Sequence, residues 1–430
     1  MSAIKLLVLS LSCLALLLVM AIMPVMADGP STDWTRQIDQ SGQGGAYVSA
    51  SPIYNNGILY VCSYSGIIYA IQYTNGVPQW KFNAGTTIYS SPVYYDDTLY
   101  VGTSNGTFYA IETMWGNEKW RFKARANIDS TPLVLNGNIY LASDDGTVYA
   151  LDSNGHEYWN LSLGTGVFTS LVGYDNVLYA TLMDGRLVAI DPNEGKVIWT
   201  VTVGDGAYSP LMYNDNLYLG THDGYIVSLE HYQGGVNWKN QTGGAVSSKP
   251  VYFDGNIYVG SWDGYMYAMN VTTGKMAWKF ATGGPIKASP FIDKANGIVY
   301  VGSGDYYLYA VDARFGLPYW KFKADSPIYS TPVMGGNNKM YFSSYGGGPI
   351  SDTSSGGPTV YALTLPDTLV MATPTSGPSI APTVTAAPTE APLQTTLMPS
   401  PTPSSSWCPL PGLLGASILG IVALASYRRR

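Results

Sequence analysis

Short apolar runs alternate with turn residues along most of the chain, and the same order of runs returns about every 40 residues. Each unit opens on a Ser-Pro-like pair such as Ser91-Pro92, followed by a short apolar run. A second run, ending like Leu99-Tyr-Val-Gly102, leads to a tight turn, a Tyr109-Ala110 run and finally a run around a Trp. Apolar runs of this length between turn residues indicate strands. The pattern predicts four strands, A to D, in every unit.

The Trp of the fourth run marks the repeat most clearly. Its copies are Trp34, Trp80, Trp120, Trp159, Trp199, Trp238, Trp278 and Trp320. A strand-rich period of roughly 40 residues is typical of the blades of a β-propeller.

The turn between strands B and C reads Asp-Gly or Asn-Gly in five units. These pairs are Asn105-Gly106, Asp145-Gly146, Asp184-Gly185, Asp223-Gly224 and Asp263-Gly264. Such pairs favour two-residue hairpins, in which both central residues have positive φ. We expect hairpins of this kind, with the Asp side chains serving the turn and not calcium.

The Ser-Pro starts and the Trp runs each number eight, but they are out of phase. The run Asp33-Trp34-Thr-Arg-Gln-Ile38 precedes the first Ser-Pro, and the last unit ends after Tyr361-Ala362 without a Trp. The N-terminal strand can therefore complete the last blade and remove the open sheet edges. We predict an all-β fold for residues 28–365, an eight-bladed β-propeller closed by the N-terminal strand. Seven blades would leave one complete set of strands unplaced.

The two ends of the chain predict export and anchoring. Residues 1–27 combine Lys5, the apolar run Leu6–Ile22 and a small-residue cleavage site, as in a signal peptide, although an uncleaved anchor is the alternative. Residues 366–407 are rich in Pro, Thr and Ser, which indicates a disordered stalk. Residues 408–430 hold an uncharged stretch and three arginines, which predicts one transmembrane helix with a basic tail. We expect a cell-surface protein anchored by this helix.

Composition narrows the partners. The net charge is −7 and only 12% of the residues are charged, so no nucleic acid is expected as a partner. Cys62 is the lone cysteine of the globular part and lies in a strand pattern, which favours a buried structural role. Four glycosylation sequons fit an exported chain: Asn105, Asn160, Asn240 and Asn270.

The run Ala268-Met-Asn-Val-Thr-Thr-Gly-Lys-Met-Ala-Trp278 resembles the quinoprotein-type repeat, and the resemblance covers nearly all of residues 34–365. That family includes eight-bladed dehydrogenases dependent on pyrroloquinoline quinone (PQQ) and BamB-like outer-membrane assembly proteins. The resemblance implies that each Trp packs between neighbouring blades and that a Gly makes room for it. The Gly positions are Gly76, Gly116, Gly155, Gly195, Gly235, Gly274 and Gly316.

The C-terminal end resembles the sorting signals of archaeal surface proteins. Pro411-Gly412 precedes the apolar stretch and the basic tail, although Leu413 stands where such signals often have Phe. Removal of the segment by a sorting enzyme is one interpretation, and a permanent anchor is the simpler one.

The resemblance to quinoprotein dehydrogenases would imply PQQ with a Ca²⁺ ion, an Asp base and an adjacent pair of cysteines. This chain has no adjacent cysteines, and its turns leave little sequence to cover a cofactor. We therefore expect no cofactor, no metal and no catalysis, with a PQQ-dependent dehydrogenase as the alternative.

A candidate binding site follows from the predicted topology. Because strands alternate in direction, the D–A and B–C connections share one face of the ring. The resemblance implies that strand A is the innermost strand of each blade, so the starts of the A strands should surround a channel on this face. The candidate ligand-binding residues at this channel mouth are Tyr89, Asp129, Lys249, Lys287 and Tyr329. Asp129 and Lys287 belong to the third and seventh blades, which face each other. Solvated charges around a water-filled channel are the simpler interpretation.

One unit departs from the repeat on the same face. The B–C connection of the eighth unit grows to about a dozen residues, Tyr345–Pro358, which are rich in Gly and Ser. A specific binding loop and flexible filler are equally compatible with this composition. We predict a non-enzymatic interaction or scaffold module of the cell envelope, whose partner is another surface protein or a glycan. A carbohydrate- or peptide-binding receptor is a further alternative.

Overall fold

In the computed structural model, residues 29–38, 50–167, 169–346 and 357–367 are described. The chain divides into the compact unit Met1–Thr375 and a second unit, Ser376–Arg430, which lies outside the described residues. The predicted signal peptide, the stalk beyond residue 367 and the C-terminal anchor lie outside them as well. No helix within the described ranges is long and apolar enough to cross a membrane.

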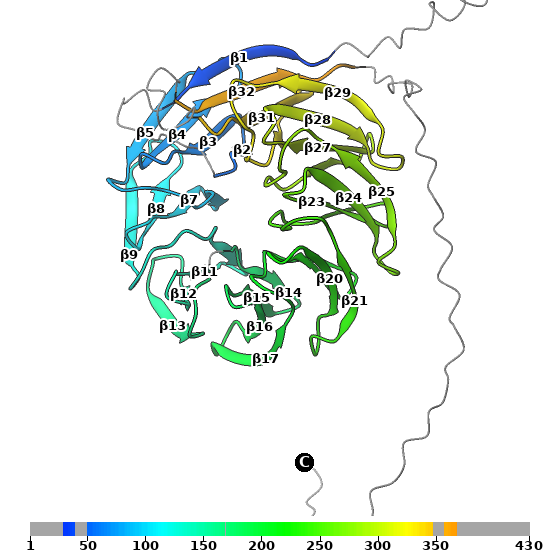
Figure 1. The fold of residues 1–430 in the computed structure, drawn as a ribbon. Coiled ribbons are helices and arrows are strands. Elements are labelled where there is room, and N and C mark those ends of the chain that lie inside the picture. Colours follow the sequence, from blue (N-terminus) through cyan, green and yellow to red (C-terminus); the bar gives the residue numbers. More distant parts are fainter. Residues whose placement is uncertain (1–28, 39–49, 168, 347–356, 368–430) are drawn as a thin grey trace, which may run out of the picture. The chain divides into compact units, whose positions relative to one another are not determined.

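The described residues form eight antiparallel sheets of four strands arranged as a ring (Figure 1). This confirms the prediction of an eight-bladed β-propeller. Blade 1 begins at β2 (Ile53–Asn55), and the blades follow one another in chain order.

The A strands are short and line the channel, and the B strands lie next to them. The A strands after β2 are β6 (Val93–Tyr95), β10 (Leu133–Leu135), β14 (Val172–Tyr174), β18 (Leu211–Tyr213), β22 (Val251–Phe253), β26 (Phe291–Asp293) and β30 (Val333–Met334). The B strands are β3 (Ile58–Cys62), β7 (Thr98–Gly102), β11 (Asn138–Ala142), β15 (Val177–Thr181), β19 (Asn216–Gly220), β23 (Asn256–Gly260), β27 (Ile298–Gly302) and β31 (Lys339–Ser343).

The C strands follow, and the D strands form the outer rim (Figure 1). The C strands are β4 (Ile67–Gln72), β8 (Thr107–Glu112), β12 (Thr147–Leu151), β16 (Arg186–Asp191), β20 (Tyr225–Glu230), β24 (Tyr265–Asn270), β28 (Tyr307–Asp312) and β32 (Thr359–Thr364). The D strands are β5 (Pro78–Asn83), β9 (Glu118–Lys123), β13 (Glu157–Ser162), β17 (Lys196–Thr202), β21 (Val236–Gln241), β25 (Met276–Ala281), β29 (Pro318–Lys323) and β1 (Ser31–Gln37).

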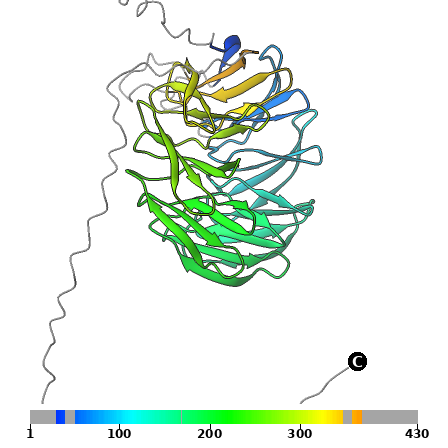
Figure 2. The same ribbon diagram turned by 90° about the vertical axis from the view of Figure 1, so that its right-hand side faces the viewer.

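The N-terminal strand closes the ring, as the phase of the repeats predicts. β1 pairs antiparallel with β32, and Trp34 lies opposite Ala362. The dark blue and orange strands lie side by side in both views (Figures 1 and 2). The side chain of Lys339 in β31 also contacts Asp33. β1 therefore covers the edge of β32 and gives the eighth sheet four strands like the other seven.

The hydrophobic core lies between neighbouring blades. The B and C strands are buried on both faces, whereas the D strands alternate between half-buried and exposed positions. One cluster joins Tyr100 and Phe108 of blade 2 to Ile139 and Leu141 of blade 3. Cys62 is buried in such a cluster, as expected, and burial raises the pKa of its thiol. Each blade therefore depends on both neighbours for its burial.

Each repeated Trp packs on the glycine of the following blade. A Cβ added to Gly155 would lie 2.6 Å from Cε3 of Trp120, and the Trp120 indole donates a hydrogen bond to the carbonyl of Ser153 at 2.9 Å. This confirms the role implied by the repeat, with one correction. The glycine against Trp199 is Gly234, with φ of +73°, and not Gly235, because the C–D turn of that unit places the left-handed residue one position earlier.

The seam between blades 7 and 8 is an exception. Trp320 is 2% exposed, and its indole N–H has no hydrogen-bond partner among the described residues. The C–D turn that would supply an acceptor is missing in blade 8, because its D strand comes from the N-terminus. Leu365, just after β32, packs in the cluster of Trp320 instead.

The predicted two-residue B–C hairpins are wrong. In blade 3 only Gly146 has a positive φ, of +83°, and its N–H bonds to Ser143 across a three-residue loop. The Asp145 carboxylate accepts a hydrogen bond from the N–H of Thr147 at 2.9 Å, which holds Asp145 at negative φ. The side chain therefore stabilises the turn, as predicted. Two-residue hairpins with two positive φ angles occur between strands A and B instead, as at Asn136 and Gly137.

Candidate functional site at the channel mouth

The D–A and B–C connections share one face of the ring, as predicted. Hydrogen bonds join the two sets of connections around the ring. The N–H of Asp144 donates to Asn127 at 2.9 Å, and the N–H of Trp262 donates to Ala245 at 2.8 Å. We call this side the mouth face, because the A strands that line the channel begin there (Figure 1).

The hydroxyl residue that opens each A strand joins blades to one another. Ser51 donates its N–H to the Ser91 hydroxyl at 2.9 Å, and Thr331 donates its N–H to the Ser51 hydroxyl at 3.0 Å. The same bond runs from Ser170 to Ser209 at 3.0 Å. These hydroxyls accept inter-blade hydrogen bonds, so their recurrence has a structural cause.

Lys249 takes the place of this hydroxyl in blade 6. Its N–H keeps the ring bond, to the Ser289 hydroxyl at 2.8 Å, while its side chain adds an ammonium group. The side chain is exposed to water, yet burial lowers its pKa. The exposure and the lowered pKa are compatible because the side chain is surrounded by protein but is still reached by the water of the channel.

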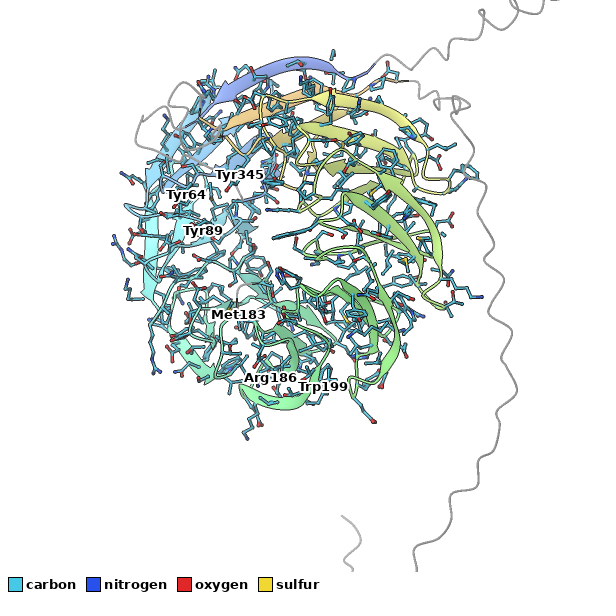
Figure 3. The ribbon with its side chains drawn as sticks, in the orientation of Figure 1. Tyr64, Tyr89, Met183, Arg186, Trp199 and Tyr345 are labelled. Atoms are coloured by element: carbon cyan, nitrogen blue, oxygen red, sulfur yellow. The ribbon has the colours of Figure 1, made fainter. Side chains whose placement is uncertain are left out.

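Aromatic side chains from blades 1, 2 and 8 gather on the mouth face. Tyr89 lies 5.4 Å from Tyr64 in an edge-to-face pair, and Tyr329 lies 5.2 Å from Tyr345 in another. Figure 3 shows Tyr345 beside the first pair, and Tyr345 is one of the groups that act on the pKa of Tyr89. A hydrogen bond with Tyr64 and burial raise the pKa of Tyr89 to about 12. The Tyr89 phenol is therefore neutral at neutral pH.

The aromatic row continues across blades 7, 6 and 5. The Lys287 ammonium lies 5.0 Å from the ring centre of Tyr329 and 4.3 Å from that of Trp262. The Trp262 indole donates to the Ser247 hydroxyl at 2.8 Å, and the His222 ring meets it edge-to-face at 5.8 Å. Three contacts thus hold Trp262 while 40% of it stays exposed. We call Tyr64, Tyr89, Tyr345, Tyr329, Trp262 and His222 the aromatic arc.

An acidic pair lies on the opposite side of the mouth. The carboxyl groups of Asp129 and Asp144 lie close enough to affect each other's pKa, and the Ser104 hydroxyl donates to Asp129 at 2.8 Å. Burial, followed by the charge of Asp129, raises the pKa of Asp144 to about 7. Oδ1 of Asp144 is buried without a hydrogen-bond partner among the described residues, and this carboxyl group stays protonated up to a pH of about 7. Asp129 and Lys287 belong to blades 3 and 7, which face each other in Figure 1.

A cavity of about 370 Å³ opens between blades 4 and 5 on the same face. Met183 and Tyr208 supply apolar walls, and Asp205 and His222 supply polar groups. The Tyr208 hydroxyl and Nδ1 of His222 are 3.2 Å apart. The cavity therefore lies against one end of the aromatic arc, at the small end of the range for ligand pockets.

The structure brings Tyr89, Lys287 and Tyr329 into one row. Asp129 lies near the Tyr89 end of this row and across the ring from Lys287. The sequence reasoning missed the B–C side of the row. Its members occupy one fixed position, directly after the Ser or Thr that ends each B strand or opens the turn. They are Tyr64, Asp144, His222, Trp262 and Tyr345. The recurrence of this position in each unit could have identified these residues from the sequence.

Two other sets of predicted residues stay untested. Most of the long loop of the eighth unit, residues 347–356, lies outside the described residues. Asn105 is exposed in a B–C turn on the mouth face, and Asn160 is exposed on β13. Asn240 donates to Gly274 at 2.9 Å, and the Asn270 side chain accepts backbone bonds in its turn. Glycosylation of these four residues stays a prediction.

The donor groups of the mouth do not fit a PQQ–calcium centre. Calcium takes six to eight oxygen ligands, whereas the acidic pair at the mouth consists of two carboxyl groups, Asp129 and Asp144. Within the described ranges, no group of three or more His, Cys, Asp or Glu side chains is placed to hold a metal ion. No reaction step is therefore assigned to PQQ or calcium at the mouth, and the expectation of no cofactor stays a prediction.

A family model described as outer membrane protein assembly factor BamB matches residues 64–280, half of the chain. The chain belongs to this BamB family. No curated protein sequence matches the chain. Among solved structures, BamB from Moraxella catarrhalis is 19% identical with a TM-score of 0.63, over 79% of this chain and 98% of that one.

Enzymes share the fold of this BamB-family chain. A quinohemoprotein alcohol dehydrogenase from Pseudomonas putida is 15% identical with a TM-score of 0.66, over 83% of this chain and 80% of that one. A europium-containing methanol dehydrogenase is 14% identical with a TM-score of 0.66, over 78% and 93%. At these identities the likeness shows the fold alone, and the fold serves both assembly factors and dehydrogenases.

Proposed function

We propose that this chain is a non-enzymatic, membrane-anchored surface propeller that binds another envelope protein through its mouth face. The observation that carries the proposal is Trp262, which is 40% exposed although three contacts hold its ring. Ordering a free side chain on binding costs about 0.5–1.5 kcal/mol, and a ring that is already held avoids this cost. Trp and Tyr are also the side chains that dominate binding energy at protein interfaces.

Membership in the BamB family supports a protein partner, because the family description is that of an assembly factor. The export signal and the anchor predicted from the sequence would place the propeller at the cell surface. The opposite face exposes aromatic residues too, including Trp115 and Phe315, at 68% and 62%. These two belong to blades 2 and 7, and neither ring pairs with another aromatic ring within the described residues.

Capture of partners from the native envelope tests the proposal, with the full chain as bait. Trp262→Ala should lose a partner that the wild type retains, because truncation of a central aromatic anchor costs about 2 kcal/mol or more. Trp115→Ala is the matched control and should retain it. Loss with Trp115→Ala and not with Trp262→Ala would assign binding to the opposite face and refute the proposal.

A PQQ-dependent dehydrogenase is the second candidate, favoured by the shared fold of the alcohol dehydrogenase structures. Incubation of the full chain with PQQ and Ca²⁺, followed by a dye-linked alcohol oxidation assay, separates the two. Saturable PQQ binding with turnover would overturn the non-enzymatic proposal. Absence of both would agree with the donor groups at the mouth.

A further inference from the structure

Lys249 and Lys287 lie on one wall of the channel mouth. The N–H of Lys249 bonds to the hydroxyl of Ser289 at 2.8 Å, and Ser289 is two residues beyond Lys287. Blade 6 therefore supplies one ammonium group and blade 7 the other, close to the start of the same pair of A strands. We call this part of the mouth the lysine wall.

No acidic side chain compensates the lysine wall within the described residues. Neither lysine takes part in an ion pair there, and Lys287 contacts only the rings of Trp262 and Tyr329 through its ammonium. The nearest turn carboxylates serve other groups. Asp263 accepts from the Tyr267 hydroxyl at 2.6 Å and from the N–H of Gly243 at 2.8 Å. Asp305 bonds in the same way to Tyr309 and Gly283.

This local excess of positive charge is unusual for the chain, whose net charge is −7. A partly desolvated ammonium without a counter-ion gains more from an incoming anion than a fully solvated one does, because part of its desolvation is already complete. Trp262, held against the Lys287 ammonium, adds an aromatic surface beside the charges. The wall thus combines two cations with an ordered aromatic anchor, which is the composition of a protein-binding hot spot.

We propose that the lysine wall binds carboxylate side chains of an acidic peptide segment in a partner protein. Lys249 and Lys287 contact the carboxylates, and Trp262 packs on the apolar part of the segment. The inference rests on the proposed function, because it takes the mouth face as the protein-binding surface. It adds the chemistry of the segment that is bound.

The opposite wall gives the site a direction. The Asp129–Asp144 pair lies across the channel from Lys287 and becomes more negative above pH of about 7. Acidic side chains are therefore repelled from blade 3 and attracted to blades 6 and 7. Charge complementarity of this kind selects orientation and partner more than it adds affinity.

Matched peptides test the inference on the full chain. An array of synthetic octapeptides pairs each Glu-containing member with its Gln counterpart, and dissociation constants are measured for pairs that bind. Glu members should bind about ten- to a hundredfold more tightly, because a charge-assisted hydrogen bond contributes about 1.5–3 kcal/mol. Lys249→Ser and Lys287→Ala should each remove most of this preference. Lys249→Ser restores the hydroxyl that the ring uses, so it is expected to fold normally.

The controls separate charge at this wall from charge in general. Lys294→Ala removes an exposed ammonium from the A–B turn of blade 7, on the other face, and should keep the preference, as should Lys249→Arg. Equal binding of Glu and Gln members, or an equal loss with Lys294→Ala, would overturn the inference. Binding of a galacturonic acid trimer at these lysines, without binding of any peptide, would overturn the peptide assignment.

The outcome is also distinct from that of the capture experiment. Capture that depends on Trp262 without any Glu preference would leave the proposed function standing and remove this inference. A Glu preference that depends on both lysines, without capture through Trp262, would remove the proposed function and leave an acidic-peptide site.

Discussion

Two glycines of blade 3 allow the Trp–Gly contact between blades to be measured. Gly155 and Gly164 have nearly the same backbone conformation, with φ of +85° and +81°. A Cβ on Gly155 would lie 2.6 Å from the Trp120 ring, whereas a Cβ on Gly164 would have nothing within 4 Å. The two Ala substitutions therefore share the strain of a left-handed residue and differ in the contact with Trp120.

The expected magnitudes follow from these two terms. A left-handed Ala costs about 1–2 kcal/mol, which both variants lose. Overpacking against Trp120 costs about 1–3 kcal/mol more in Gly155→Ala. Displacement of the indole would also weaken its 2.9 Å bond to Ser153, a loss of about 1 kcal/mol. Gly155→Ala should thus be less stable than Gly164→Ala by about 1–4 kcal/mol.

Urea unfolding followed by circular dichroism measures both variants against the wild type. A lower midpoint for Gly155→Ala with an unchanged slope reports a change in native stability. Equal midpoints for the two variants would refute the reasoning, because the Trp contact would then carry no energy. A further Trp120→Ala change should abolish most of the difference.

Three further predictions concern single features of the ring. Burial raises the pKa of Asp144 to about 7, so the folded state binds its proton more tightly than the unfolded chain, and this stability is lost as pH rises from about 4 to 7. Relative to Asp144→Asn, the free energy of unfolding of the wild type should fall by about 1–2 kcal/mol across that window after solvent screening. Urea unfolding at pH 4.5 and pH 8 measures this difference, and the same pH dependence in both proteins would contradict it. Trp320→Phe should cost about 1 kcal/mol less than Trp120→Phe in the same assay, because the Trp320 N–H has no acceptor; equal losses would argue that it has one. Deletion of residues 29–37 removes β1 and should lower the unfolding midpoint and increase self-association in sedimentation, since it exposes the edge of β32; an unchanged monomer would contradict the closure.

The sequence predicted the architecture because every structural decision in a propeller is repeated. The Trp copies and the Ser-Pro starts report the same unit at two phases, and their offset requires that β1 complete the blade of β32. Local chemistry was less reliable. Asp145-Gly146 has the letters of a two-residue hairpin, but a side-chain bond to Thr147 stabilises a three-residue loop instead. Gly235 and Gly234 are also indistinguishable by spacing, and only the backbone shows which one meets Trp199.

The candidate site was half predicted. Tyr89, Lys287 and Tyr329 followed from their position before the A strands. Their partners lie on turns that only the ring brings to the same face. Tyr64 and Trp262 stand 25 residues before Tyr89 and Lys287, and Tyr345 stands 16 residues after Tyr329. The structure also gives the Ser and Thr residues that open the A strands a structural role, because the Ser91 and Ser51 hydroxyls accept hydrogen bonds from neighbouring blades.

The sequence by itself determined the number of blades, their strand order, the closing strand and the face on which the A strands begin. These depend on periodicity and on chain direction, which are properties of the sequence. Only the tertiary structure decided that Lys287 lies against Trp262, that the charge of Asp129 acts on Asp144, and that Lys249 has no acidic partner in the described residues. Such contacts depend on how neighbouring blades are packed, and no repeat unit contains that information alone.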